Sequence, residues 1–331
     1  MSRKWLPPVI SIVFVISGLL YHIQSLDRIN NVFYDTLLKI TANKPETDVP
    51  VVLVTATEKF IQQLGHEPSR KDYAKLINLL KDSKLIVSDI FFPSRQAEEI
   101  DRILGDTFAL HSEKIILPVF TPFKLKEKWN ETGYKVNYLN ENHPYFQSKI
   151  KHLGHINVFP DSDTIVRKCP VFISYYGDAY PHIAIKAFML LGNKRVDFKR
   201  FKGFNRPSNT VPVDEDGCFL IRFLKPDSMT GMIYPMEDVL TGKIQPATFK
   251  NKIVVIGHTI IGSKNADLIP TPFGVQFGAI VQMQALYTVF SGHYIWPVGV
   301  EIILMIIGLF LLLSLFLFTN FWRGTRFFII A

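Results

Sequence analysis

Residues 50–56 read PVVLVTA, a continuous apolar run that is typical of a strand buried on both faces at the centre of a parallel sheet. Apolar residues at helical spacing follow in residues 72–80 (DYAKLINLL), and a second apolar run lies at residues 85–92 (LIVSDIFF). Residues 97–110 again favour a helix, and residues 114–120 (KIILPVF) form a third apolar run. This alternation predicts βαβ units around a parallel sheet.

The sequence beyond this core predicts further helices and hairpins. Residues 124–150 are polar and aromatic without a clean period, which favours a long loop. Turn-forming residues predict one hairpin, with strands at 154–158 and 165–175, and a second hairpin over 210–223. The remaining expected elements are helices over 182–191, 235–240 and 276–290 and a strand over 252–256. The expected fold class is α/β, with a mixed, largely parallel sheet, flanking helices and β-hairpins in one domain, plus transmembrane helices.

Two uncharged apolar segments flank this domain. Residues 5–21 (WLPPVISIVFVISGLLY) follow Arg3 and Lys4, and residues 302–318 (IILMIIGLFLLLSLFLF) precede Arg323. Each is long enough to span or nearly span a bilayer, and the basic flanks predict that both outer ends lie in the cytoplasm. A cleaved signal peptide is the alternative for the first segment. The absence of a small-residue cleavage pattern favours an uncleaved anchor.

These segments divide the chain into five expected regions. They are a cytoplasmic N-terminus (1–5), a transmembrane helix (6–23), an extracytoplasmic domain (24–295), a second transmembrane helix (296–320), and a cytoplasmic turn that leads into a further apolar run (321–331). We interpret the apolar ending as a truncation before further spans.

Composition disfavours several classes of function. Lys and Arg total 37 against 29 for Asp and Glu, but these basic residues are spread along the chain, which disfavours a nucleic-acid partner. The two cysteines, Cys169 and Cys218, leave open either a single disulfide or two buried thiols. The histidines have no metal-ligand spacing and no G-x-S-x-G motif is present, so we expect no metal, no cofactor and no catalytic residue.

One segment superficially resembles a phosphate-binding loop. Residues 257–264 read GHTIIGSK, which follows the G-x-x-x-x-G-K-[ST] pattern except that its last two residues are reversed. Two prolines follow at positions 270 and 272, where such a loop requires a helix. We therefore disfavour nucleotide binding here.

Asp89 lies between apolar residues, where a carboxylate costs free energy unless it is paired. It is either a structural partner of a backbone amide or of an arginine such as Arg167, or part of a ligand site. The sequence leaves both interpretations open.

Six sequence blocks, in order, resemble the CHASE domains of type 2, which are extracytoplasmic sensory modules of bacterial cyclases and kinases. The blocks are YD at 34–35; LGHEPSR at 64–70 with YA at 73–74; SDIFF at 88–92 with Asp101; GHINV at 154–158 with Asp161, Asp163, Arg167 and Pro170; VLTG at 239–242 with FKNKIVVIG at 249–257; and Asp267 with TP at 271–272. Departures from the family pattern occur at Ala56-Thr57, at Thr164 and around Gln282.

The resemblance implies a sensor in a bacterial inner membrane that works as a homodimer and detects an extracytoplasmic ligand or protein. It also implies a cytoplasmic output module, such as a nucleotide cyclase, diguanylate cyclase or kinase, beyond this chain. In open α/β sheets ligands bind at the carboxyl ends of the strands. The candidate ligand-binding residues are Thr57, Asp89, Asp101, Arg167 and Asp267. An envelope assembly protein without output and an ectoenzyme are the alternatives.

Overall fold

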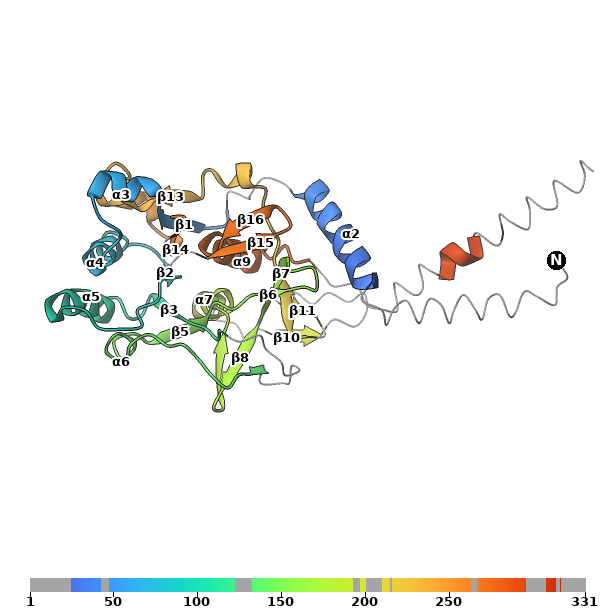
Figure 1. Ribbon diagram of the computed structural model, residues 1–331, viewed down its shortest axis with the longest axis horizontal. Coiled ribbons are helices and arrows are strands. Elements are labelled where there is room, and N and C mark those ends of the chain that lie inside the picture. The colour runs from blue at the N-terminus through green and yellow to red at the C-terminus, as the bar shows by residue number, and fades with distance from the viewer. Residues whose placement is uncertain are drawn as a thin grey trace, which may run out of the picture.

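The computed structural model describes residues 25–42, 48–122, 133–192, 197–200, 210–214, 216–262, 267–295, 308–313 and 316. Its centre is a six-stranded sheet in the order β13-β1-β14-β2-β3-β5, and every neighbouring pair in it is parallel (Figure 1). The strands are β1 (Val51–Ala56), β2 (Leu85–Ser88), β3 (Ile115–Val119), β5 (His152–His155), β13 (Ile233–Pro235) and β14 (Ile253–His258). β1, β2, β3 and β14 are buried along their whole length, as their apolar sequences predict.

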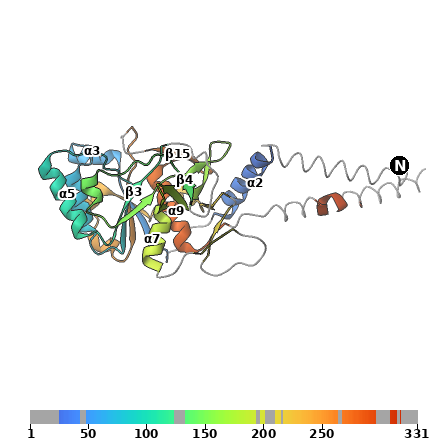
Figure 2. The same cartoon turned by 90° about the horizontal axis from the view of Figure 1, so that it is seen from below.

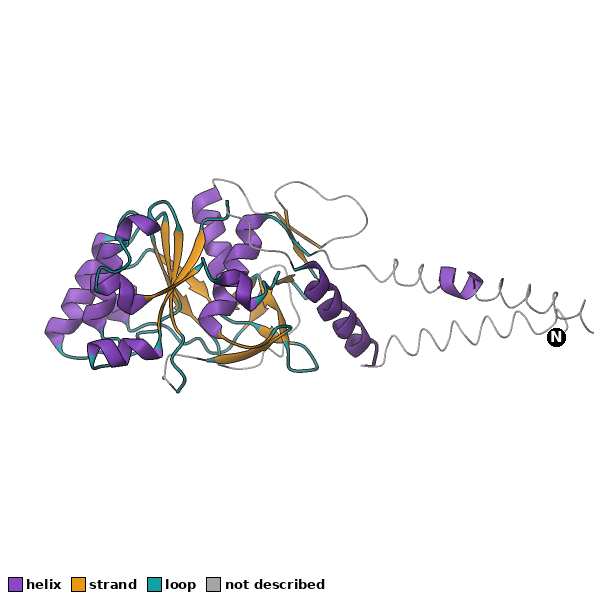
Figure 3. Cartoon of the chain, turned by 90° about the horizontal axis from the view of Figure 1, so that it is seen from above, coloured by secondary structure: helices purple, strands orange, loops and turns teal. Residues whose placement is uncertain are grey.

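Helices cover both faces of this sheet (Figure 3). Because side chains alternate along a strand, β1 directs Leu53 into one core cluster and Val52 and Val54 into the other. The cluster with Leu53 includes α7 (Ile183–Gly192) and α9 (Gly278–Ser291). The other includes α3 (Glu58–Leu64), α4 (Arg70–Leu79), α5 (Glu98–Leu110), α6 (Pro144–Gln147) and α8 (Met236–Leu240). The result is a three-layer α/β/α arrangement.

Smaller sheets form a second region beside α7 and α9. A three-stranded antiparallel sheet contains β6 (Phe159–Pro160), β7 (Val166–Pro170) and β12 (Cys218–Leu220). A mixed three-stranded sheet contains β4 (Tyr134–Lys135), which is parallel to β8 (Phe172–Tyr175), and β9 (Asp178–Pro181), which is antiparallel to β8. Two-stranded pairs are formed by β10 (Asp197–Arg200) with β11 (Thr210–Val213), and by β15 (Leu268–Thr271) with β16 (Gly274–Phe277). Two 3₁₀ helices, η2 (Pro226–Met229) and η3 (Pro246–Phe249), complete these elements.

The first helix described, α2 (Ser25–Thr41), lies at the end of the domain opposite α5 (Figures 1 and 2). It precedes the central sheet in the chain.

Several expected elements are confirmed, and others are corrected. Residues 154–155 belong to β5 of the central sheet, so the expected first strand of the hairpin is wrong, and the hairpin consists of β6 and β7. The reason is Gly154, which lies so close to α7 that a Cβ atom there would be 3.1 Å from the Cα of Ile183. The turn at 214–217 is confirmed by a 2.8 Å bond from the Asp214 amide to the Cys218 carbonyl. However, β12 pairs with β7 rather than with β11.

Three boundaries also differ from expectation. The strand expected over 85–92 ends at Ser88, because the Ser88 hydroxyl bonds to the amide of Ile90 (3.1 Å) and to its carbonyl (3.2 Å) and turns the chain. The loop expected over 124–150 contains β4 and α6, although residues 123–132 lie outside the described residues. The helix expected from residue 276 starts at Gly278, because the two preceding residues pair within β16.

The cysteines resolve into the second of the two alternatives. Cys169 and Cys218 are both buried and free. Cys169 is opposite Phe219 and Cys218 is opposite Pro170, so the two thiols point to opposite faces of the β7–β12 pair and into different core clusters.

The expected span over 6–23 lies outside the described residues, as does most of 296–320. Only residues 308–313 and 316 of the second segment are described, and they are helical. Across the described part of the chain, no helix has both the length and the apolar character needed to cross a membrane.

Candidate functional site

The carboxyl ends of β1, β14 and β2 meet at one edge of the central sheet. The chain leaves β1 for α3 and β2 for α5, both on one face, whereas the chain after β14 leads to α9 on the opposite face. Connections that leave neighbouring parallel strands toward opposite faces open a crevice between them, and ligands of α/β proteins bind there. Thr57, Asp89 and His258 lie at the ends of these three strands.

Asp89 is the most unusual group at this edge. Its backbone amide donates a 2.8 Å bond to the carbonyl of Ile256, which continues the pairing of β2 with β14. The residue as a whole is half-buried, and protein surrounds its carboxyl group densely. Within the described residues its carboxylate has no hydrogen-bond partner, and burial together with the charge of Asp267 raises its pKa well above the usual carboxyl range.

Asp267 lies near Asp89, beside the N-terminus of α9. The Gly278 amide donates a 3.0 Å bond to the Asp267 carbonyl, and a Cβ atom on Gly278 would lie 2.1 Å from Oδ1 of Asp267. Burial raises the pKa of Asp267, against the opposing effect of the backbone amides of Asp267 and Gly278. The structure therefore brings Asp89 and Asp267 together, as the sequence predicted.

A close helix–strand contact positions α9 against this edge. A Cβ atom on Gly257 of β14 would lie 2.3 Å from the Cβ of Ala279 and 3.8 Å from that of Asp89. Only a glycine at position 257 opposite a small residue at 279 lets α9 begin so near the strand end. Gly257 therefore lies next to both Asp89 and the first turn of α9.

Thr57 is held by a residue that the sequence did not single out. Its hydroxyl hydrogen-bonds Oε1 of Glu237, and its amide lies 3.5 Å from Oε2 of the same carboxylate. Glu237 is fully buried in α8, whereas an acidic residue in the first turn of a helix is ordinarily exposed, so no sequence signal marked it. Thr57 also caps α3 by accepting a 3.2 Å bond from the Lys59 amide.

His258 occupies the last position of β14 and is buried. Its Nε2 atom is hydrogen-bonded to the hydroxyl of Tyr73, and the two rings are stacked 5.9 Å apart. Burial lowers the pKa of His258 to about 4, so the imidazole is neutral near neutral pH. It therefore places an uncharged side chain at the carboxyl end of β14, against Tyr73 of α4.

Asp101 is not part of this site. It is fully buried in α5, where it pairs with Arg70 and Arg95 and accepts a 2.9 Å bond from the Gln96 amide. Burial raises its pKa, but the bonds from Gln96, Arg95 and Arg70 outweigh this effect and lower the pKa overall. The physical reason for the difference from the expectation is that two guanidinium groups already saturate this carboxylate, so it joins α4 to α5.

Arg167 lies in β7, away from the central sheet, and is buried. Its guanidinium group forms ion pairs with three carboxylates: Asp35 of α2 and two residues of the turn between β6 and β7, Asp161 and Asp163. Arg167 is therefore not beside Asp89, and the expectation of one shared site for all five residues is wrong. Sequence separation alone does not show that residues 35 and 167 are neighbours.

The matches to known proteins agree with this architecture. A family model described as the CHASE2 domain matches residues 10–315, nearly the whole chain. The chain belongs to the CHASE2 domain family. CHASE2 domains are extracytoplasmic sensory domains of signalling receptors. No curated protein and no solved structure matches the chain.

The family pattern maps onto three separate structural units of this CHASE2 domain. The blocks around Asp89 and Asp267 form the crevice edge, those around Arg70 and Asp101 join α4 to α5, and those around Arg167 hold α2. The last two residues of the phosphate-loop-like motif, 263 and 264, lie outside the described residues, and the next element described is β15.

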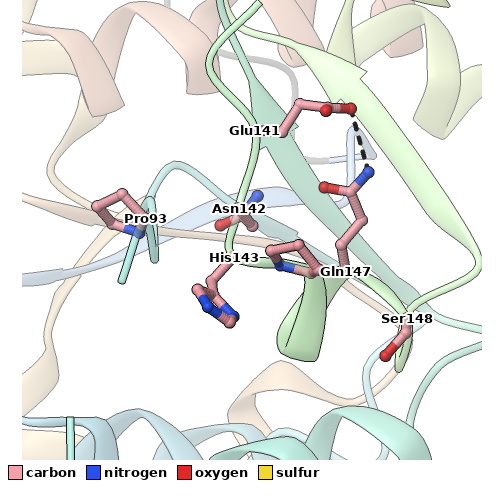
Figure 4. A pocket seen from close by; sticks show the side chains of 7 residues that line it. Pro93, Glu141, Asn142, His143, Gln147 and Ser148 are labelled. Carbon is pink, nitrogen blue, oxygen red and sulfur yellow. Dashed lines mark hydrogen bonds between the residues drawn. The ribbon is translucent and has the colours of Figure 1, made fainter. Parts of the chain in front are cut away.

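The CHASE2 domain also contains an open pocket of ≈ 370 Å³ beside α6 (Figure 4). Its polar lining is already paired within the protein: Gln147 donates a 3.1 Å bond to Glu141, and Asn142 bonds to the Phe92 amide and the Pro118 carbonyl. None of the predicted site residues lines it. The crevice at Asp89 is therefore the better candidate.

Proposed function

We propose that this CHASE2 domain is the extracytoplasmic part of a transmembrane receptor. It binds a ligand in the crevice between Asp89 and Asp267 and relays binding through spans at 6–23 and 296–320 to a cytoplasmic output module, such as a nucleotide cyclase, diguanylate cyclase or kinase. The single observation that carries the proposal is the unpaired Asp89 carboxylate at the carboxyl edge of the central sheet.

The free energy of Asp89 explains why this position suits a ligand. An unpaired carboxylate surrounded by protein destabilises the fold, and such groups cluster at functional sites. Asp101 shows the contrast, since it is inaccessible and fully paired. A ligand that carries a positive charge or N–H donors would pair with Asp89 and relieve this cost. We therefore propose a cationic or donor-rich small molecule as the ligand class.

The position of α9 supplies a route from the crevice to the second span. Asp267 contacts the first residue of α9, and α9 ends at Ser291, just before the expected span at 296–320. A ligand shifts the receptor only by binding one arrangement more tightly than the other. A ligand that draws Asp89 and Asp267 together would favour one position of the α9 N-terminus.

Asp89→Asn is expected to increase the free energy of unfolding near neutral pH by about 0.5–2 kcal/mol, because asparagine keeps the shape without the charge. The pKa of Asp89 is raised in the folded state, so the free energy of unfolding decreases as the pH rises above the usual carboxyl range. Asparagine does not ionise, so the variant does not lose this part of the free energy of unfolding. Urea unfolding of both proteins at mildly acidic and neutral pH measures the difference.

Asp101→Asn is the matched control and is expected to destabilise the domain, because it weakens two ion pairs. If Asp89→Asn also destabilises the domain near neutral pH, Asp89 is a structural partner and the ligand crevice is not at this residue.

A further inference from the structure

Among the α2 residues whose side chains the structure describes (31, 32 and 34–41), those that pack against the domain lie on one face, which carries Tyr34, Asp35 and Leu38. Leu38 is buried in the core cluster that contains α9, and the Tyr34 hydroxyl donates a 3.3 Å bond to the Ile221 carbonyl. Val32, Leu37 and Ile40 are exposed on other sides of the helix. Asp35 on the packed face forms an ion pair with Arg167 of β7. Helix α2 itself lies at the end of the domain (Figures 1 and 2).

All five N–H groups of the Arg167 guanidinium are used in this contact. Nε and Nη2 each donate a 2.8 Å bond to Asp35. Nη1 donates to Asp161 (2.8 Å) and to Asp163 (2.9 Å), and Nη2 also donates to Asp163 (2.8 Å). Two bonds therefore cross to α2 and three stay within the β6–β7 turn, because Asp161 and Asp163 precede β7 directly.

The charges at this cluster do not balance. One guanidinium faces three carboxylates, so the formal charge is +1 − 3 = −2. Burial raises the pKa of Asp161 even though Arg167 lowers it, whereas bonds from Arg167 lower the pKa of Asp163. Within the turn the charge of Asp163 raises the pKa of Asp161, and the nearby Lys168 ammonium lowers it.

Breaking a buried ion pair is usually costly because it leaves an unpaired buried charge. Here the departure of α2 would leave Arg167 with three bonds to Asp161 and Asp163, while Asp35 would become hydrated. The contact thus holds α2 without making its release prohibitive.

We propose that Asp35 and Arg167 form a reversible latch that holds α2 against the domain and lets it detach while β6 and β7 stay folded. The latch follows from these contacts alone. Its use to signal through the preceding segment at 6–23 rests on the proposed function, and it is independent of ligand binding at Asp89.

Hydrogen exchange of the full chain in detergent micelles, read by mass spectrometry, tests the latch with Asp35→Ala. Alanine is a strong helix former, so faster exchange in α2 reports detachment rather than lost helix propensity. Loss of two charge-assisted hydrogen bonds is expected to speed exchange of the α2 amides about tenfold to hundredfold. Exchange of the β6 and β7 amides is expected to stay as in the wild type.

Asp161→Ala is the matched control, since it removes a carboxylate from the same guanidinium but leaves both bonds to Asp35. Its α2 amides are expected to exchange no faster than in the wild type. Unchanged α2 exchange in Asp35→Ala would show that the ion pair does not hold the helix. Equal acceleration in α2 and β7 would show a fixed structural network instead of a latch. Neither result would affect the proposal that a ligand binds at Asp89.

Discussion

Arg167→Ala is expected to lower the free energy of unfolding by about 3–5 kcal/mol, the range found when one partner is removed from a buried ion pair. The variant leaves Asp35, Asp161 and Asp163 side by side with no shared cation. Removal of Asp35 leaves Arg167 paired, so the effect of Asp35→Ala is expected to be much smaller. Urea unfolding of the full chain in micelles, followed by near-UV circular dichroism, measures both.

Lys243→Ala provides the control, because Lys243 forms an exposed pair with Asp238 and such pairs contribute about 0–1 kcal/mol. If Arg167→Ala and Asp35→Ala lowered the free energy of unfolding by the same amount, the account would be contradicted. Such a result would mean that the guanidinium group needs its bonds to Asp35 as much as α2 needs its bonds to Arg167.

Two buried histidines are expected to make the domain sensitive to acid. His155 in β5 and His182 before α7 are fully buried, with ring centroids 5.1 Å apart. His182 Nδ1 accepts a 3.2 Å bond from the Ala184 amide. The other three ring nitrogens have no hydrogen bond of good geometry within the described structure. Burial, and for His155 also the charge of His182, lowers both pKa values, that of His182 to about 3.

The sign of the pH effect follows from these lowered pKa values. In the unfolded chain both histidines bind protons below a pH of about 6.5, whereas in the folded chain they stay neutral. Stability is therefore complete above this pH and falls as the pH decreases toward the folded pKa values. For two sites the expected loss from neutral pH to a pH of about 5 is about 4 kcal/mol.

His155→Phe tests this expectation through the slope of unfolding free energy against pH, whatever its effect on stability at neutral pH. Phenylalanine does not titrate, so the slope between pH values of about 6 and 5 is expected to fall by the contribution of one histidine, while His182 and His258 keep theirs. An unchanged slope would show that His155 is protonated in the folded state. The contact between β5 and α7 would then tolerate a charged imidazole.

The parallel sheet was predictable from local sequence because its strands are buried on both faces. The runs at β1, β2, β3 and β14 contain almost no polar residues, which few other structures allow. β5 was mispredicted for a physical reason: its sequence His-Leu-Gly-His has no apolar run, and its place in the sheet depends on the contact of Gly154 with α7. Pairings such as β7 with β12 join distant segments, and no local pattern specifies them.

The candidate site likewise contains some residues that the sequence predicts and others that it does not. Thr57, Asp89 and Asp267 were predicted together because strand ends share an edge, and the structure places all three there. Glu237 was missed because its burial depends on α8 packing over β1. Arg167 was assigned to the wrong place, because the family motif shows which residues belong together in sequence but not that Asp35 is the partner.

The central claim is that this CHASE2 domain faces the outside of the cell, and one labelling experiment tests it directly. Cys169 and Cys218 are buried, whereas Tyr176, in the turn between β8 and β9, is 89% exposed. Tyr176→Cys therefore adds one accessible thiol. With a membrane-impermeant maleimide, intact bacterial cells that express this variant are expected to show labelling of the chain, and cells with the unaltered chain are not. Labelling of the variant only after lysis would place the domain in the cytoplasm and contradict the account.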